Sequence, residues 1–317
     1  MANPSDYRFK NVTQIGLAGP GEQMRSNLLA WLRWGFLSIG AFRKNMRTDL
    51  APPGNVNPCL LKLVSDPRRT ANTLWQGFRS DWIWEQNLDY AYQPQSITGI
   101  YVNGSFVASN STGAYQHTVL YPQGEIQFAS AQSSTLVVEC EHSYCTVQVR
   151  RAQEGWLKQL AMRSFRADDT QFTQGGGLGG AWDMLAESRI QLPAVLVEDA
   201  NVQNQVPLEM GSSKQQWDEQ FLLHCIAETE PECRRLLDVL SSQKDSRILT
   251  YDIDGATPPL NVFGVLQVGA KTYPEMCAAN PWRLMSVQDV RSTSPVQDSG
   301  GKLFWATLRY TIRAWAP

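Results

Sequence analysis

The segment KLFWATLRYTIRAW, residues 302–315, constrains the fold more than any other part of the chain. Apolar side chains such as Phe304 and Leu308 alternate along it with polar ones such as Arg309 and Arg313. This period of two predicts a β-strand with one buried face and one partly solvated face. At about 3.3 Å per residue, the strand would be roughly 45 Å long. It must therefore be paired along its length or run past the edge of its domain.

The preceding segments predict the rest of this domain, residues 191–317. LPAVLVEDA, NQVPLEMG and QQWDEQFLLHCIAET read as strands, the last with Phe221 and Cys225 on one face. Thr229 is a candidate helix N-cap followed by Pro231 in the first turn, and an apolar stripe then follows helical spacing. SRILTYDID, VFGVLQVGA and WRLMSVQDVRS are also expected to be extended. The sequence thus predicts an α/β domain with a mixed or antiparallel sheet and a packed helix.

The N-terminal half predicts a helix and a β-sandwich-like domain over residues 26–150. Ser26 is a candidate N-cap for a helix over about 27–43, and strand-like segments follow at 59–65 and 81–92. Asn103-Gly104 and Pro122–Gly124 lie between short apolar runs and predict two hairpins. A third hairpin is expected over 134–150, turning at His142-Ser143. With residues 1–25 as an extended arm and 151–190 as a helical, glycine-rich linker, the fold class is α+β.

Bulk properties exclude several classes of protein. The formal net charge is −2, so no global basic field points to nucleic-acid binding. The N-terminus lacks the pattern of a signal peptide, and the most apolar stretch, 28–42, is too short for a bilayer and contains Arg33. The six cysteines have no regular spacing, so free buried thiols are expected. These features predict a soluble protein made in the cytoplasm.

Two motifs could carry chemistry. GGGLGG, residues 175–180, satisfies the G-x-G-x-x-G pattern of dinucleotide sites, but the polar segment RADDTQFTQ stands where a buried strand is required. We therefore expect a hinge or a loop that contacts another subunit. Cys140, His142 and Cys145 form a weak candidate metal site that lacks a fourth ligand, unless His117 or Cys59 supplies one. We expect neither a resident cofactor nor an enzyme.

The order of segments in residues 190–317 resembles the tail-terminator and neck proteins of tailed bacteriophages. The resemblance rests on LPAVLVEDA, VPLEMG, the strand that runs directly into a helix over QQWDEQFLLHCIAETEPECRRLLDVLSSQ, RILTYDID and the final FWATLRYTIRAW. In the N-terminal half, DWIWEQNLDYAYQPQSITGIYVNGSFV is similar to segments of phage virion proteins. Short tail terminators lack such an added domain, so its role stays open.

The resemblance implies a structural virion protein, assembled in the host cytoplasm, that forms a homo-oligomeric ring in the neck. Its implied partners are further copies of itself in a hexamer, the head-side connector, the tail tube protein and, in a contractile tail, the sheath protein, with DNA passing through the lumen. A head-completion adaptor, a baseplate component and a glycan-binding β module remain alternatives. Candidate interface residues are Trp305, Arg309, Arg313, Gly177 and Gly179.

Overall fold

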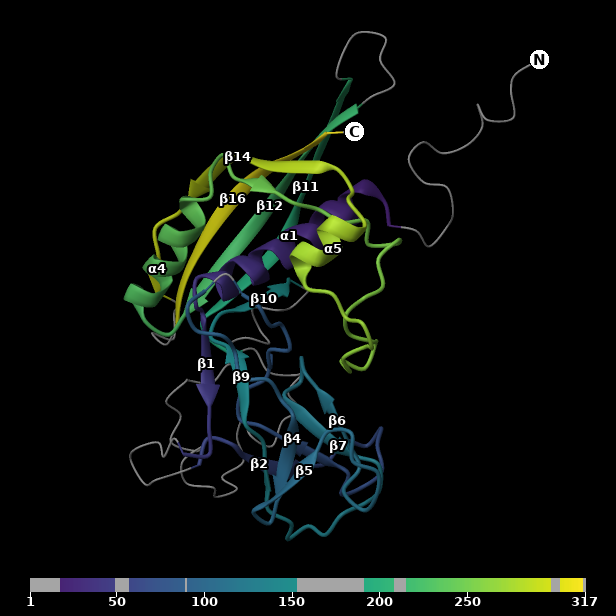
Figure 1. The fold of residues 1–317 in the computed structure, drawn as a ribbon. Helices are drawn as coiled ribbons and strands as arrows, with labels where there is room; N and C mark the ends of the chain where they lie inside the picture. The colour runs from purple at the N-terminus through teal and green to yellow at the C-terminus, as the bar shows by residue number, and fades with distance from the viewer. Residues whose placement is uncertain are drawn as a thin grey trace, which may run out of the picture.

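The chain forms two units, drawn one above the other in Figure 1. This computed structural model describes residues 18–48, 57–88, 90–152, 191–207, 215–297 and 303–315. The upper unit is a long sheet covered by helices, and the lower unit consists of short strands. The fold class is α+β, as predicted.

A seven-stranded sheet forms the frame of the upper unit. Its order is β10-β11-β12-β16-β14-β13, and β15 pairs separately with β16. The β10–β11 ladder is parallel and the other described ladders are antiparallel, so the sheet is mixed. The strands are β10 (Gln148–Arg151), β11 (Ala194–Pro207), β12 (Gln215–Ala227), β13 (Arg247–Ile248), β14 (Leu284–Ser292), β15 (Val296–Gln297) and β16 (Phe304–Trp315).

Strand β16 is central and is paired along its whole length. Its twelve residues pair with β12 from Phe304↔Ala227 to Trp315↔Gln216, while β14 and β15 pair with its other edge. The predicted alternation is confirmed, since one side of the strand is buried and the other is partly exposed. The hydroxyl of Tyr310 donates a hydrogen bond to the Leu240 carbonyl at 2.5 Å. The buried positions are Ala306, Leu308, Tyr310, Ile312 and Ala314.

Helices α1 (Pro20–Ser38), α4 (Glu230–Ser241) and α5 (Tyr273–Ala279) belong to the upper unit, and α1 and α4 pack on one face of its sheet. The start of α4 is as predicted, because the Thr229 side chain accepts a hydrogen bond from the Glu232 backbone N–H. Its buried stripe, Cys233, Leu236, Leu237 and Leu240, joins the core formed by the sheet.

Helix α1 differs from the prediction in its bounds and in its place. Gly19 is the N-cap and Pro20 occupies the first turn, whereas Ser26 lies inside the helix. Residues 20–25 are therefore helical and not part of an extended arm. Buried side chains of α1 pack in the same core as the upper sheet, although the helix was predicted to belong with the β-rich segment. The order of the segments does not reveal which core the helix joins, because its apolar face could pack in either one.

The lower unit contains a seven-stranded path, β5-β4-β8-β2-β3-β7-β6. Both predicted hairpins are present: Asn103 and Gly104 have φ angles of 49° and 81°, and Gly124 closes the second turn with φ 67°. Side chains from both halves of the path pack in one core, where the rings of Trp75 and Phe128 meet edge to face at 5.0 Å. The strands are β2 (Leu60–Val64), β3 (Leu74–Gln76), β4 (Gly99–Val102), β5 (Ser105–Ala108), β6 (His117–Leu120), β7 (Glu125–Phe128) and β8 (Val138–Glu139).

The third predicted hairpin is wrong. Strand β8 pairs with β2 and β4, whereas β9 (His142–Cys145) pairs with β1 (Phe42–Asn45), directly after α1. Residues 148–151 form β10 and belong to the upper sheet. The sequence pattern identified extended segments here, but it carries no information about their partners.

Three other segments also differ from the prediction. The described residues of segment 81–92 form no strand, although Trp82 forms an isolated bridge with Tyr144. NQVP continues β11 after an irregularity between Asp199 and Gln203, so two expected strands are one. VFGVLQVGA lies in a loop that reaches the lower unit, where Gly264 accepts a hydrogen bond from the Tyr121 backbone N–H.

The two faces of β16 should tolerate substitution very differently. Leu308→Asp places a carboxylate in a fully buried position and should prevent folding, because an unpaired charge in a core costs several kcal/mol. Arg309→Glu changes an exposed side chain on the other face and should give a folded protein. Circular dichroism of both variants measures this. A folded Leu308→Asp protein would contradict the assigned register.

Candidate functional site: the open sheet face and the cleft between the units

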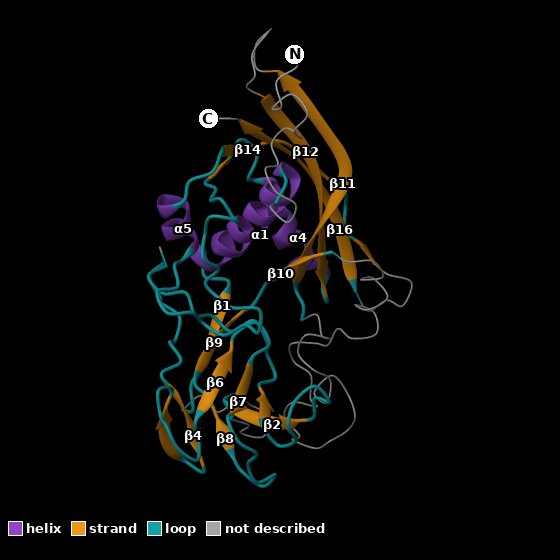
Figure 2. Cartoon of the chain, turned by 90° about the vertical axis from the view of Figure 1, so that its right-hand side faces the viewer, coloured by secondary structure: helices purple, strands orange, loops and turns teal. Residues whose placement is uncertain are grey.

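The face of the upper sheet that points away from α1 and α4 is the first candidate surface. Figure 2 shows these helices on one side of the long strands. No described helix packs on the other side. Every second side chain of β12 and β16 points to this side; most of these side chains are polar and half-buried. We call this surface the open face; it carries Asp218, His224, Trp305, Thr307, Arg309, Thr311 and Arg313.

Arg313, a predicted interface residue, is bound by a carboxylate of the same chain. Its Nε and Nη2 atoms donate to the two carboxylate oxygens of Asp218 at 2.8 and 2.9 Å, and the two residues are register partners on β16 and β12. Hydrogen bonding to Asp218 raises the pKa of Arg313. This two-pronged pair fixes the guanidinium in the plane of the open face.

Arg309 is an exposed cation of this face. It lies opposite Arg291 in the β14–β16 register, and Arg291 in turn donates to Asp289 at 2.8 Å. Like charges directly opposite each other on neighbouring strands repel. Because Arg291 is paired with Asp289, the uncompensated positive charge of this pair is that of Arg309.

Trp305 lies at the other end of the open face beside a polar cluster. Its ring is 5.6 Å from that of His224, and it packs against a small apolar core that includes Leu196 and Ile226. His224 Nε2 lies 2.7 Å from a carboxylate oxygen of Glu198. The prediction placed Trp305, Arg309 and Arg313 on one face, and the structure brings all three onto it; Gly177 and Gly179 lie outside the described residues.

The three candidate metal ligands do not converge. Cys140 packs in the core of the lower unit, while Cys145 packs in a separate cluster with Leu37 and Ile83. Burial raises the pKa of both thiols, which opposes the thiolate form that zinc requires. Within the described ranges, no group of three or more His, Cys, Asp or Glu side chains is placed to hold a metal ion.

Both ring nitrogens of His142 form hydrogen bonds within the chain. Its Nδ1 donates to the Cys140 carbonyl at 2.9 Å, and its Nε2 accepts from the Asn45 side-chain amide at 3.2 Å. The ring stacks on Trp82 with centroids 4.4 Å apart. Both nitrogens of the neutral ring are thus used, so this histidine is a buried structural residue.

The second candidate surface is a cleft between the two units with a volume of about 300 Å³. Helix α1 contributes Arg33 and Trp34, and the segment after β3 contributes Asp81, Trp84 and Glu85. The sequence did not predict this site. Arg33, Asp81 and Glu85 were all assigned to residues 26–150, but no pattern in the sequence indicates that they pair, and other lining residues such as Tyr251 and Tyr273 come from residues 191–317. The remaining lining residues are Ala30, Trp82, Pro122, Val149, Arg150, Pro259, Leu260 and Met276.

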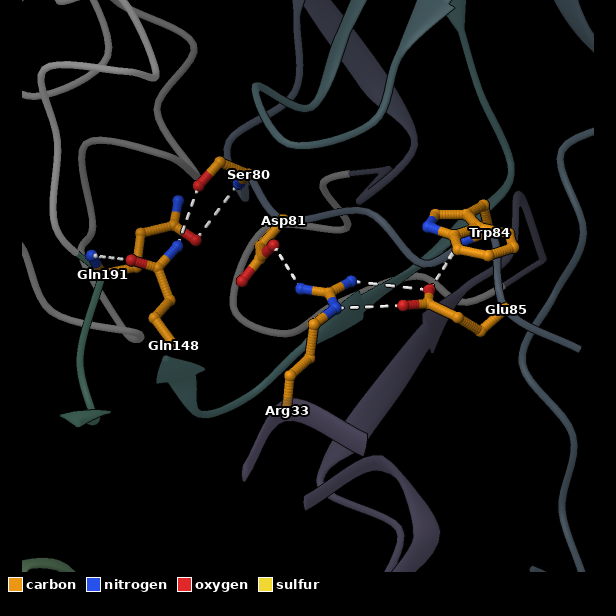
Figure 3. A network of polar contacts seen from close by, with 7 residues as sticks. All are labelled: Arg33, Ser80, Asp81, Trp84, Glu85, Gln148 and Gln191. Carbon is orange, nitrogen blue, oxygen red and sulfur yellow. Dashed lines mark hydrogen bonds and ion pairs between the residues drawn. The ribbon is translucent and has the colours of Figure 1, made fainter. Parts of the chain in front are cut away.

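Arg33 joins the two units at the cleft. Its Nη1 donates to Asp81 Oδ1 at 2.7 Å and its Nε donates to Glu85 Oε1 at 3.0 Å, as Figure 3 shows. Burial would raise the pKa of Asp81, but attraction to Arg33 and Arg150 outweighs it, so this pKa lies below its usual value. Arg33 stands within the most apolar stretch of the sequence, and this position was the available signal for a buried ion pair.

A chain of amides continues this junction. Gln148 of β10 donates to the Ser80 hydroxyl at 2.9 Å and accepts from the Gln191 backbone N–H at 2.9 Å. Gln191 in turn donates to the Phe78 carbonyl at 2.8 Å and accepts from the Ser80 backbone N–H at 3.1 Å. All of these hydrogen bonds are buried, and Figure 3 shows the network beside Arg33. The units are therefore joined by specific polar contacts.

No protein-family model matches this chain, and no curated protein matches its sequence. The resemblance to phage neck proteins therefore stays a prediction. Among the described helices, none is both long and apolar enough to cross a membrane.

Replacing Arg33 should weaken the whole molecule. Arg33→Met leaves two buried carboxylates without their cation and should lower the free energy of unfolding by about 3 kcal/mol. Arg234→Met is the matched control, because Arg234 and Glu230 form an exposed pair on α4 worth about 0.5 kcal/mol or less. Urea unfolding followed by tryptophan fluorescence measures both. Equal losses in the two variants would contradict the role of Arg33.

His142 should make stability depend on pH. Burial lowers its pKa from 6.5 to about 4, so the unfolded chain binds a proton between these values while the folded chain does not. Stability should therefore be full above pH 6.5 and fall as the pH drops to about 4, by roughly 3 kcal/mol for this group. Urea unfolding at several pH values should show that His142→Gln loses this component; an unchanged pH dependence would contradict it.

Proposed function

We propose that this chain is a structural protein of a tailed-phage virion that forms a ring in the neck. The ring would cap the tail tube, stop its growth and join it to the head-side connector, and in a contractile tail it would also hold the last sheath ring. Its partners would be copies of itself in a hexamer, the connector-side protein and the tail tube protein, while DNA passes through the lumen.

The open face is the observation that supports this proposal most. The long strands are covered on one side, yet the other side carries half-buried polar residues and an exposed Arg309 opposite Arg291. A ring subunit contacts its two neighbours through different surfaces, which close by rotation. Such a subunit needs a broad, rigid surface, and a sheet paired along its length provides one.

The charge of the chain fits a conduit for DNA. With a formal net charge of −2, the subunit has no general attraction for the phosphate backbone. Its arginines on the open face are partly neutralised, because Arg313 is bound to Asp218 and Arg291 to Asp289. A ring of this kind would let DNA pass without retaining it.

The assembly state tests the proposal. The purified chain should be a hexamer, or a monomer that becomes hexameric on isolated tails, as measured by light scattering coupled to size-exclusion chromatography. Electron microscopy of the particle should locate the chain in the neck. A chain that stays monomeric with tails present, or that is absent from the neck, would contradict the proposal.

Arg309→Glu should separate folding from assembly. Because Arg309 is exposed and lies in the middle of the open face, reversing its charge should leave the monomer folded and abolish ring formation. Arg234→Glu provides the control, since it reverses an exposed arginine on α4, on the covered side of the sheet. Chromatography should show rings for the control alone. Rings formed by Arg309→Glu at the wild-type level would place the interface elsewhere.

A further inference from the structure

One loop of the chain presents four large apolar side chains to solvent. It spans residues 258–270, between β13 and α5, and we call it the apolar loop. Val262 is 93% exposed and Phe263 is 62% exposed, and Leu266 and Val268 are exposed as well. Single apolar residues are common on protein surfaces, whereas several close together mark a contact surface.

The apolar loop is held in shape by its own hydrogen bonds. Asn261 Oδ1 accepts from the backbone N–H groups of Phe263 and Val265 at 2.9 and 3.1 Å, and the Asn261 N–H donates to the Val265 carbonyl at 2.9 Å. Gly264 has a φ angle of 83°, and its carbonyl accepts from the Tyr121 N–H of the lower unit. The exposed tip is therefore preorganised, which reduces the entropy lost when it binds.

Two other side chains anchor the apolar loop to the lower unit. Val265 packs against a cluster that includes Val64 and Leu74, and Leu260 packs against the main core of that unit. The loop thus buries these two side chains within its own chain, while Val262 and Phe263 stay available to a partner.

An apolar groove lies between helices α1 and α4. Its volume is about 240 Å³, which is below the range of roughly 300–1,000 Å³ typical of small-molecule sites. A groove of this size suits one or two apolar side chains better than a metabolite. Its lining residues are Trp31, Leu32, Gly35, Phe36, Ser38, Ile39, Val239, Leu240 and Gln243.

Gly35 makes room in this groove. It lies inside α1, where glycine is less favourable than alanine. A Cβ atom at this position would meet nothing within 4 Å beyond its chain neighbours and the adjoining backbone of the helix. Ile39, directly after α1, is 56% exposed and adds an apolar rim.

The chemistry of the two surfaces matches. Residues 255–270 carry no formal charge, and neither do the residues that line the groove. Bringing the two together would therefore remove water from apolar surface without burying a charge, as in the core of a protein interface. A membrane surface fits the loop less well, because residues 255–270 contain no Lys or Arg to attract anionic lipids.

The loop and the groove lie on different sides of the chain. In Figure 1 the apolar loop is the yellow-green segment below α5, on the side of α1 away from α4, and Figure 2 also places α5 and α4 on opposite sides of α1. Two different surfaces on opposite sides can join one copy to the next. Such a heterologous contact closes into a ring or continues as a filament.

We propose that the apolar loop of one copy inserts into the groove between α1 and α4 of the next copy, with Phe263 seated over Gly35 and Val262 beside Ile39. The inference does not rest on the proposed neck function, because this contact uses neither Arg309 nor the open face. It is tested without phage tails, whereas the neck function is tested by locating the chain in the particle, so either can fail alone.

Cysteine cross-linking tests which surfaces meet. Val262→Cys and Ile39→Cys are made in separate full-length chains, mixed and oxidised with copper phenanthroline, so that a link between the two positions joins two copies. All six native cysteines are buried, which keeps the background low. The mixture should give a dimer with the 262–39 link, identified by mass spectrometry. Val137→Cys, at another exposed apolar position, mixed with Ile39→Cys is the control and should give about tenfold less.

Two variants test the energy of the contact. Phe263→Ser shortens the inserted side chain, and Gly35→Leu fills the groove from within a helix that tolerates leucine well. Each should weaken self-association about tenfold or more, as measured by analytical ultracentrifugation. Phe106→Ser and Arg235→Leu are the matched controls, because they change an exposed phenylalanine and add a leucine on α4 outside the groove. Circular dichroism should show that all four variants are folded.

Three results would overturn the proposal. The first is a yield of the 262–39 link no higher than that of the control pair. The second is self-association that Phe263→Ser and Gly35→Leu both leave unchanged while they are folded. The third is binding of the chain to vesicles of phosphatidylcholine and phosphatidylglycerol, lost in Phe263→Ser, without any 262–39 link, which would assign the loop to a membrane surface.

Discussion

The burial of one face of β16 is the interaction on which the rest of the structure depends. Leu308, Tyr310 and Ile312 are fully buried, and they pack in one core with α1, α4 and the neighbouring strands. Because side chains alternate along a strand, burying this face commits Arg309 and Arg313 to the other. The covered layer and the open face are thus consequences of a single register, which pairing with β12 and β14 fixes along the whole strand.

The same core determines how the two units are joined. Helix α1 is anchored in it by Leu28 and Leu32, and this places Arg33 at the boundary with the lower unit. The segment that follows β3 then supplies Asp81 and Glu85 to that guanidinium. Removing one partner of a buried ion pair is strongly destabilising, because it leaves an uncompensated charge in the interior. Here the ion pair defines one relative placement of the units and leaves an aromatic cleft beside it.

Local patterns in the sequence were sufficient to predict several secondary-structure elements and which face of a strand is buried. The alternation in β16, the cap at Thr229 and the Asn103-Gly104 turn depend on neighbours in sequence, and each was predicted. Which strands pair with each other was not predictable from such local patterns. The expected hairpin at His142 failed, because β9 pairs with β1, a strand about a hundred residues earlier. The cleft was missed for the same reason. Arg33 and Asp81 lie 48 residues apart, and no local pattern in the sequence indicates that their side chains pair.

A rigid open face and a fixed junction have a mechanical consequence. A load applied to the lower unit reaches the upper sheet through Arg33 on α1 and through Gln148 on β10, which pairs directly with β11. Both routes end in elements that pack in the core or hydrogen-bond within the sheet. Displacing the units therefore requires breaking buried hydrogen bonds and exposing carboxylates, not just bending a linker. A junction of this kind is compatible with the neck function that we propose.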